Sequence, residues 1–301
     1  MPQVSESKIS CRGFSLIELI IVIILTGILA GILFTIIRGP LQAYVQVERR
    51  ATLVDIVETA LQRMTREIRL ALPYSVRANS PGGFQAVEFL RTLDGGRYRS
   101  KGPNRLKFNQ SSGTFDVLNT LTNFSSVATA TSAAPSQDCI NSIADCLVVY
   151  NIGQPLSSVT AAATGISANA YLGASSAYKG DIAAITAAAA NSITFDNSDL
   201  SWNFGLKSPQ QRFHIVDTPV SFVCNGSAIY RYSDYPITEN QPSNPGGNMN
   251  LLIDHVTGCS IQYDKPTLTR FGLLTISITV TDPDSGESVS LLQQIHVTNV
   301  P

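Results

Sequence analysis

The chain has 301 residues and a formal net charge of −1, and only 14% of its residues are charged. This length allows one or two domains with a sizeable hydrophobic core. Because the sparse charges form no basic stripe along the sequence, the composition argues against nucleic acid as a partner.

The amino-terminal segment predicts a membrane protein. Residues 1–13 are short and polar, whereas residues 14–37 contain a single charge, Glu18. That apolar run exceeds the roughly 20 residues that a helix needs to cross a bilayer. A secretory signal places its small-residue cleavage site after the apolar core, but here Gly13 precedes it. We therefore expect a removable leader at 1–13 and a transmembrane helix at 14–37 that stays on the mature protein.

The junction Arg12-Gly13-Phe14-Ser15-Leu16-Ile17-Glu18-Leu19 resembles the type IV pilin signature. The resemblance implies that a prepilin peptidase cuts between Gly13 and Phe14 and that the new amino group of Phe14 is methylated. It also implies that Glu18, the fifth mature residue, meets the amino terminus of a neighbouring subunit during assembly. The alternative is an ordinary anchor with an incidental acid, which the cost of an ionisable group in a membrane span disfavours.

Within the predicted span, Gly27 and Gly31 form a Gly-x-x-x-Gly step. Such a step lets two membrane helices approach closely, which makes it a candidate assembly face. The alternative is that the two glycines have no packing role, because small residues are common in membrane helices.

Residues 38–72 predict an amphipathic continuation of the helix. Apolar residues recur there at spacings of three and four, at Leu53, Val57, Leu61, Met64, Ile68 and Leu72. This periodicity indicates one buried face, so we interpret the stripe as core, and Pro73 is expected to end the helix. Gly39-Pro40 is expected to interrupt it with a kink or a locally loosened turn, because proline removes a helical hydrogen bond.

Five cysteines are present, and Cys11 would leave with the leader. The other four fit an oxidising compartment such as the periplasm and allow three pairings. We favour Cys139 with Cys146 and Cys224 with Cys259. Buried free thiols are the alternative, and a zinc site lacks the usual Cys-x-x-Cys spacing.

Residues 73–301 predict a β-rich head. Strand-like runs lie between turn residues at 84–90, 105–108, 146–152, 212–216, 220–224, 228–232, 272–281 and 288–297. Asp217-Thr218-Pro219, Asn225-Gly226 and residues 282–286 are expected to form turns. Residues 125–191, rich in Ala, Ser, Thr and Gly, are interpreted as a long surface excursion with little core, with room for one short helix. The expected fold class is α+β, with a long amino-terminal helix on a mostly antiparallel sheet domain.

Four carboxy-terminal stretches, FHIVDTPVSFVC, IYRYSDYPI, LLIDHVTGCSIQYD and GESVSLLQQIHVTNVP, carry a second resemblance. They are similar to minor pilins of the MshO type from mannose-sensitive haemagglutinin (MSHA) pili, and more distantly to J-type minor pseudopilins of type II secretion. The resemblance implies a single-pass protein of the bacterial inner membrane with a periplasmic head, later part of a pilus. Its implied partners are the major pilin, other minor pilins and the peptidase.

Two rival functions remain open at this point. The first is a tip adhesin that binds a surface ligand through Tyr230, Tyr232 and Tyr235 or through the 125–191 segment. The second is a pseudopilin of a secretion machine.

The sequence offers little catalytic chemistry. His214, His255 and His296 are scattered, with no nucleophile elbow, phosphate loop or dinucleotide fingerprint beside them. Asp282, Asp284 and Glu287 lie in a segment with turn chemistry, without the ligand spacing of a calcium loop. We therefore expect no enzyme activity, cofactor or metal.

Overall fold

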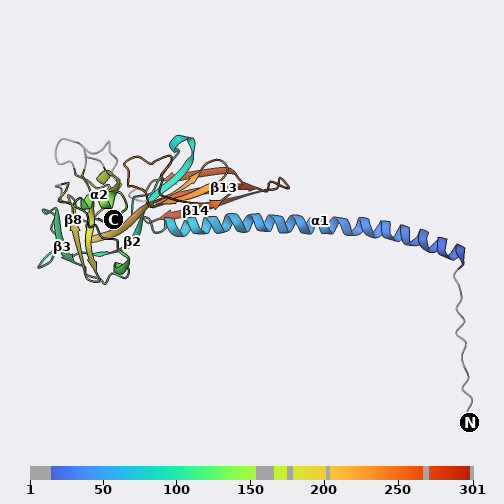
Figure 1. The fold of residues 1–301 in the computed structure, drawn as a ribbon, viewed down its shortest axis with the longest axis horizontal. Coiled ribbons are helices and arrows are strands. Elements are labelled where there is room, and N and C mark those ends of the chain that lie inside the picture. Colours follow the sequence, from blue (N-terminus) through green and yellow to red (C-terminus); the bar gives the residue numbers. More distant parts are fainter. Residues whose placement is uncertain (1–14, 154–165, 175–178, 201–203, 267–270, 299–301) are drawn as a thin grey trace, which may run out of the picture. The chain divides into compact units, whose positions relative to one another are not determined.

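The computed structural model describes residues 15–153, 166–174, 179–200, 204–266 and 271–298 (Figure 1). The chain divides into two compact units, Met1–Thr52 and Leu53–Pro301. One long helix, α1 (Leu16–Ile68), supplies the described structure of the first unit and the start of the second. Almost all of the regular secondary structure in the rest of the second unit is β, so the protein is α+β, as the sequence predicted.

In the first unit, every described side chain from residue 15 to residue 52 is exposed. The helix continues through Gly39 and Pro40, so this dipeptide does not end it, and the kink or loosened turn expected there stays a prediction. A proline in a helix interior costs about 3 kcal/mol, mainly because it lacks one donor and crowds the preceding turn. In α1 that loss stays local, because the helix is regular on both sides of it.

In the second unit, the amphipathic prediction is confirmed. The buried residues of α1 are Leu53, Val57, Ala60, Leu61, Met64 and Ile68. They pack in a common core with sheet residues that include Phe89 and Phe222. The helix ends at Ile68 and not at Leu72, because the chain turns there to pair with a strand: the Leu72 amide donates to the Leu90 carbonyl at 2.8 Å.

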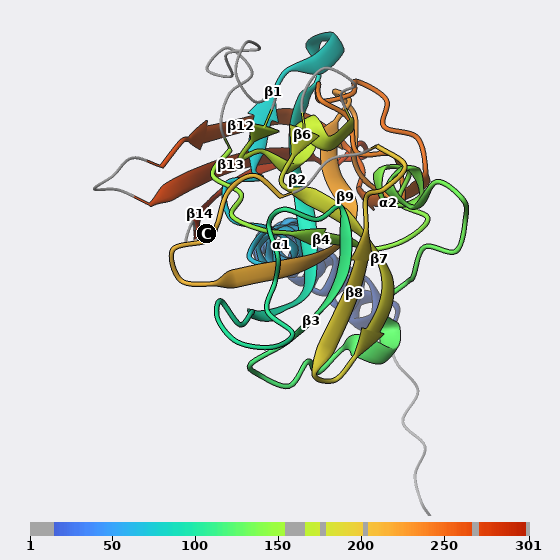
Figure 2. The same cartoon turned by 90° about the vertical axis from the view of Figure 1, so that its left-hand side faces the viewer.

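The main sheet has nine strands. Its strand order is β1 (Arg77–Asn79), β2 (Gln85–Arg97), β9 (Arg212–Cys224), β4 (Cys146–Val148), β7 (Ile182–Ala189), β8 (Ser192–Asp196), β3 (Ser112–Asp116). Strand β10 (Ile229–Ser233) pairs with β9, and β11 (Asn248–Ile253) pairs with β10. All of these pairings are antiparallel, and Figure 2 shows β7, β8 and β3 side by side.

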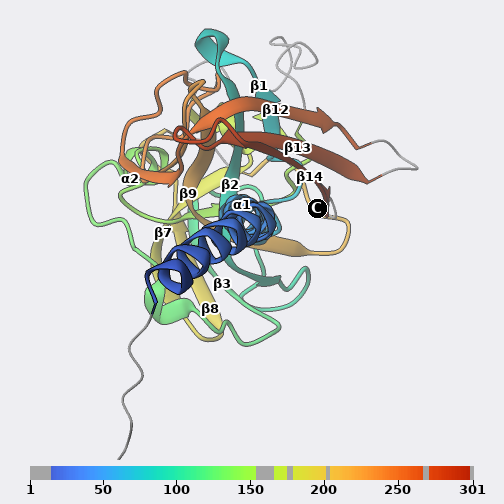
Figure 3. The same cartoon turned by 90° about the vertical axis from the view of Figure 1, so that its right-hand side faces the viewer.

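A second antiparallel sheet contains β12 (Val256–Asp264), β13 (Gly272–Thr281) and β14 (Ser288–Val297), as Figure 3 shows. The predicted hairpin of β13 and β14 is confirmed in full register. Asp282 closes its turn by accepting bonds from the Asp284 amide and the Ser285 hydroxyl, which is the turn chemistry expected. A short parallel pair, β5 (Ile166–Ser167) and β6 (Lys179–Gly180), completes the described strands.

The helical pieces of the head are short. They are η1 (Pro81–Gly83), η2 (Phe124–Ser126), α2 (Pro135–Ile140) and η4 (Ala170–Ala174).

The turn predicted at Asp217-Thr218-Pro219 is wrong, because β9 runs straight through these residues. The pairing of β2 with β9 shifts register twice opposite this point, between Leu90 and Asp94. Such bulges bend a strand without ending it, and they tolerate a proline that has no amide donor. The Arg91 guanidinium also holds the Asp217 carboxylate across the two strands, with its Nε 3.0 Å from one carboxylate oxygen.

The strand predicted at 105–108 is also wrong, since these residues lie in a loop. Gly102 and Asn104 adopt positive φ angles of 84° and 51° just before it, which turns the chain out of extended conformation. The strand predicted at 146–152 is shorter than expected and ends at Val148.

The interpretation of 125–191 as a surface excursion with little core is wrong. This segment supplies α2, β4 and β7, and β4 and β7 lie inside the nine-stranded sheet. Small residues such as Ala183 and Ala184 are buried next to larger ones such as Leu147 and Ile185, so small and large side chains together fill the volume. Residues 154–165 and 175–178 of the segment lie outside the described residues.

The structure joins Cys139 to Cys146 and Cys224 to Cys259, the pairs that the sequence favoured, with Cα atoms 5.3 Å and 6.5 Å apart. The first bond links α2 to β4, and the second links the end of β9 to β12. The second bond therefore ties the two antiparallel sheets together.

We predict that the two disulfides stabilise the head unequally. The bonds span sequence separations of 7 and 35 residues. Loop-closure entropy then gives about 2.5 kcal/mol for the first and about 3.8 kcal/mol for the second. Replacing Cys224 and Cys259 together by serine should lower the melting temperature more than replacing Cys139 and Cys146. Non-reducing peptide mapping of the wild type checks the pairing, and a cross-paired peptide would contradict it.

Candidate assembly site

The first turn of α1 places Glu18 at the start of the apolar segment. The Ser15 carbonyl accepts the amides of Glu18 at 3.0 Å and Leu19 at 3.1 Å, so Ser15 begins the helical hydrogen bonding. Glu18 is thus three residues into the helix, where a negative charge lies favourably in the helix dipole. Its carboxylate is exposed, and within the described part of the chain it has no ion pair.

The segment after Glu18 is apolar on all sides. Its large side chains, from Leu19 to Ile37, are exposed around the whole circumference. The two threonine hydroxyls bond back to the helix, Thr26 to the Val22 carbonyl at 2.7 Å and Thr35 to the Ile32 carbonyl at 2.8 Å. A surface of this kind is stable in lipid or among other apolar helices, and not in water. By length and composition α1 is a candidate membrane span.

Gly27 and Gly31 leave open space on one side of this segment. A Cβ added at either glycine would meet no heavy atom within 4 Å. No contact inside the described chain therefore requires these glycines, and a packing role depends on another helix. The predicted cleavage residues Gly13 and Phe14 lie outside the described residues, so the structure does not place them relative to Glu18.

Residues 9–34 match the family model of the prokaryotic N-terminal methylation motif. The chain carries a type IV pilin-like prepilin signal. The matched segment includes Gly13, Phe14, Glu18, Gly27 and Gly31. Such a signal indicates processing by a prepilin peptidase and assembly with other pilins, and with the apolar α1 it is consistent with membrane anchoring. No curated protein and no solved structure matches the chain.

The three tyrosines of the adhesin hypothesis do not form one surface. Tyr230 and Tyr232 lie on the same face of β10, with ring centroids 6.5 Å apart. Tyr235 is buried in the head, and its hydroxyl is 2.7 Å from the Ser221 hydroxyl oxygen. Only the first two are accessible to a ligand.

The three histidines lie apart on β9, in the loop before β12 and on β14. Burial lowers the pKa of His214 to about 4, which keeps it neutral at physiological pH. Exposed His255 is adjacent to Asp254, at 3.1 Å between Nδ1 and Oδ1. Among the described residues, no group of three or more His, Cys, Asp or Glu side chains could hold a metal ion.

Two features of the head were missed by sequence reasoning. The first is a buried ion pair of Arg77 with Glu88. No local sequence pattern predicts this pair, because its two residues come from different strands. The second is a cavity lined by Arg105 and Lys207. Its sequence signal is the run from Arg97 to Lys107, which has five cations and no acid but is averaged out in the whole-chain charge.

Proposed function

We propose that this chain is a minor pilin that takes part in the initiation or assembly of a type IV pilus of the MSHA type. The observation that carries the proposal is the prepilin signal leading directly into a helix whose surface is apolar on all sides. A helix of that kind can move from the membrane into the core of a filament. The protein then acts as a structural subunit and not as an enzyme.

The size of the head supports a terminal position. The second compact unit runs from Leu53 to Pro301, and each copy of a repeating subunit must fit within a small axial rise. A bulky head is easier to place once, at the tip, than along the whole filament. We therefore propose that each pilus contains few copies of this protein. Its head starts a complex of minor pilins, and the major pilin then adds below that complex. Immunogold labelling at regular intervals along sheared pili would exclude the terminal position.

The finer assignment to the MshO type rests on the resemblance of the carboxy-terminal stretches. The second candidate is a J-type pseudopilin of type II secretion, favoured by the same stretches. Deleting the gene and counting pili while measuring protein export separates the two. Loss of pili with normal export supports the minor pilin, and loss of export with normal pili supports the pseudopilin.

The prepilin signal predicts cleavage after Gly13. Mass spectrometry of the membrane-extracted protein should show an N-methylated chain that begins at Phe14, because the small glycine precedes the apolar segment directly. A Gly13→Val variant expressed in the same host should keep the leader. An intact Met1 terminus on the wild-type protein, in a host that has the peptidase, would contradict the prediction.

A further inference from the structure

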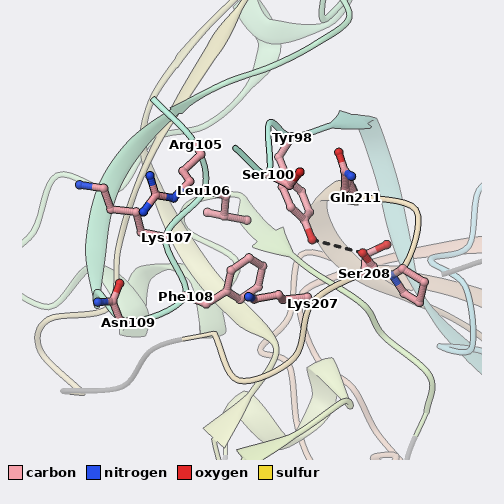
Figure 4. Close-up of a pocket in the computed structure, with 11 residues that line it drawn as sticks. Tyr98, Ser100, Arg105, Leu106, Lys107, Phe108, Asn109, Lys207, Ser208 and Gln211 are labelled. Carbon is pink, nitrogen blue, oxygen red and sulfur yellow. Dashed lines mark hydrogen bonds between the residues drawn. The ribbon is translucent and has the colours of Figure 1, made fainter. Parts of the chain in front are cut away.

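A cavity of about 490 Å³ opens on the head between the loop at 98–109 and the segment at 207–211. Its volume lies within the range of small-molecule sites, roughly 300 to 1,000 Å³. Tyr98 and Leu106 are buried there, and the ring of Phe108 is partly exposed. Figure 4 shows Arg105 and Lys107 on one side, Tyr98 and Gln211 on the other, and Lys207 beside the Phe108 ring.

The charged side chains that line this cavity are Arg105, Lys107 and Lys207, and no Asp or Glu lines it. Residues 97–115 and 204–216 contain seven of the chain's 21 Lys and Arg residues and no Asp or Glu. They are Arg97, Arg99, Lys101, Arg105, Lys107, Lys207 and Arg212. None of the seven forms an ion pair within the described part of the chain. A concave site lined by unpaired charges of one sign concentrates ions of the opposite sign.

The polar groups that complete the lining suit hydroxyl-rich ligands. Ser100, Asn109 and Gln211 offer a hydroxyl and two amides, each able to donate and to accept hydrogen bonds. The Tyr98 hydroxyl is engaged inside the protein, donating to the Ser208 carbonyl at 3.4 Å, and burial raises its pKa to about 12. It therefore belongs to the uncharged floor of the cavity.

Phe108 argues against a nucleobase as the ligand. Sites for single-stranded nucleic acid stack successive bases on open aromatic faces. Here one ring is partly exposed, and the Lys207 ammonium already lies 5.6 Å from its centroid. A ring occupied in this way offers an apolar edge and a nearby cation, which fits the mixed apolar and anionic surface of a charged sugar.

We infer that this cavity binds an acidic saccharide, with Arg105 and Lys207 contacting its carboxylate or sulfate groups. The Phe108 ring contacts the apolar face of a sugar, and the amides of Asn109 and Gln211 bond its hydroxyls. This site is distinct from both binding surfaces of the adhesin hypothesis, the tyrosine cluster and the 125–191 segment. It is also independent of the helix through which the subunit is proposed to assemble.

The direct test is titration of the full-length protein in phosphatidylcholine nanodiscs with three hexamers. Hexamannuronate should bind, and raising the salt concentration should weaken that binding. Maltohexaose, of equal length but neutral, should bind at least about tenfold more weakly, the loss expected for one charge-assisted hydrogen bond. Hexadeoxythymidylate should also bind more weakly than hexamannuronate. Tighter binding of the nucleotide, or no binding of the uronate, would overturn the inference.

Variants locate the site. Arg105→Ala and Lys207→Ala should each reduce hexamannuronate affinity about tenfold. The matched control is Lys265→Ala, which removes one exposed lysine that lines a different pocket of the head. It should leave affinity unchanged. Equal effects of Lys207→Ala and Lys265→Ala would overturn the location.

A measurement on the wild-type protein tests the same site without depending on the folding of a variant. Bound hexamannuronate should protect Lys207 from acetylation by an amine-reactive ester, with the modified residues counted by mass spectrometry. Lys265 should react equally with and without the saccharide. Unprotected Lys207 at saturating saccharide would overturn the inference.

Discussion

Replacing Glu18 by alanine is expected to remove the protein from assembled pili while leaving the membrane-inserted protein and its folded head at wild-type levels. Glu18 has no ion pair or side-chain hydrogen bond inside the described part of the chain, so folding does not depend on its charge. It is also the single charge in residues 15–37. An acid in that setting requires a partner from outside the chain once the surrounding water or interface is lost.

The expected effect is large because the positive charge that pairs with Glu18 would also be left without an opposite charge. In the proposed assembly, the Glu18 carboxylate meets the amino terminus of a neighbouring subunit among apolar helices. Removing one member of a buried ion pair costs about 3 to 5 kcal/mol, since the other charge stays buried and unpaired. At about 1.4 kcal/mol per tenfold change, that is a loss of roughly two to four orders of magnitude in incorporation.

The matched control is Glu48→Ala, which removes an exposed acid from the same helix beyond the apolar segment. It should be incorporated normally. Glu18→Gln separates charge from hydrogen bonding, because the amide keeps an acceptor and loses the charge. The measurement is the ratio of variant to major pilin in sheared pili, set against the amount in membranes. Wild-type incorporation of Glu18→Ala would show that the acid is incidental.

Local patterns in the sequence predicted those parts of the fold that depend on neighbouring residues. The spacing of Leu53, Val57 and Leu61 gave the buried face of α1, because side chains three and four apart share one side of a helix. The residues of the 282–286 turn predicted the β13–β14 hairpin, because Asp and Gly set the backbone conformation of a turn locally. The prepilin junction was also recognisable, because its residues are contiguous.

Long-range pairing was not predictable in this way. β9 continues through Asp217-Thr218-Pro219 because β2 bulges opposite it and Arg91 holds Asp217, and neither fact is visible around residue 217. The segment 125–191 was misjudged for a related reason. Alanines carry little side-chain volume, so their burial on β7 depends on the neighbouring strands β4 and β8.

The charged site in the head also depends on contacts between residues that are far apart in the sequence. Arg105 and Lys207 are about a hundred residues apart in sequence, and only the fold brings both to one cavity. Whole-chain charge was therefore a poor guide to where the charge lies. The expectation that the sparse charges form no basic stripe along the sequence is wrong for residues 97–107, which hold five cations and no acid.

The Arg77–Glu88 pair is the feature whose disruption should most reduce the stability of the head. Glu88 on β2 is fully buried, and its Oε1 lies 2.6 Å from the Arg77 guanidinium. That guanidinium stacks 3.8 Å from the centroid of the Tyr171 ring and donates to the Thr238 and Glu239 carbonyls. Burial raises the pKa of Glu88, and the charge and hydrogen bond of Arg77 oppose that rise.

We predict that Arg77→Ala destabilises the head by about 3 to 5 kcal/mol at pH 8, because it leaves a buried carboxylate without its cation. Arg63→Ala is the control, since Arg63 is exposed and its pair with Glu67 is an i,i+4 pair on α1 that solvent screens. That substitution should cost about 1 kcal/mol or less. Chemical unfolding of the full-length protein, followed by circular dichroism, measures both. Equal costs for the two arginines would contradict the prediction.

The cost of Arg77→Ala should also depend on pH in a defined direction. Without Arg77, desolvation raises the pKa of Glu88 in the folded state further above its value in the unfolded chain. The folded variant then binds more protons than the unfolded one between those two pKa values, so its stability falls as pH rises through that window. The gap between variant and wild type should therefore narrow from pH 8 to pH 5. Adding Glu88→Gln to Arg77→Ala should remove this pH dependence, because no ionisable group remains at residue 88. If the stability difference between Arg77→Ala and the wild type stays constant with pH, lost packing on Tyr171, and not the unpaired charge, causes the destabilisation.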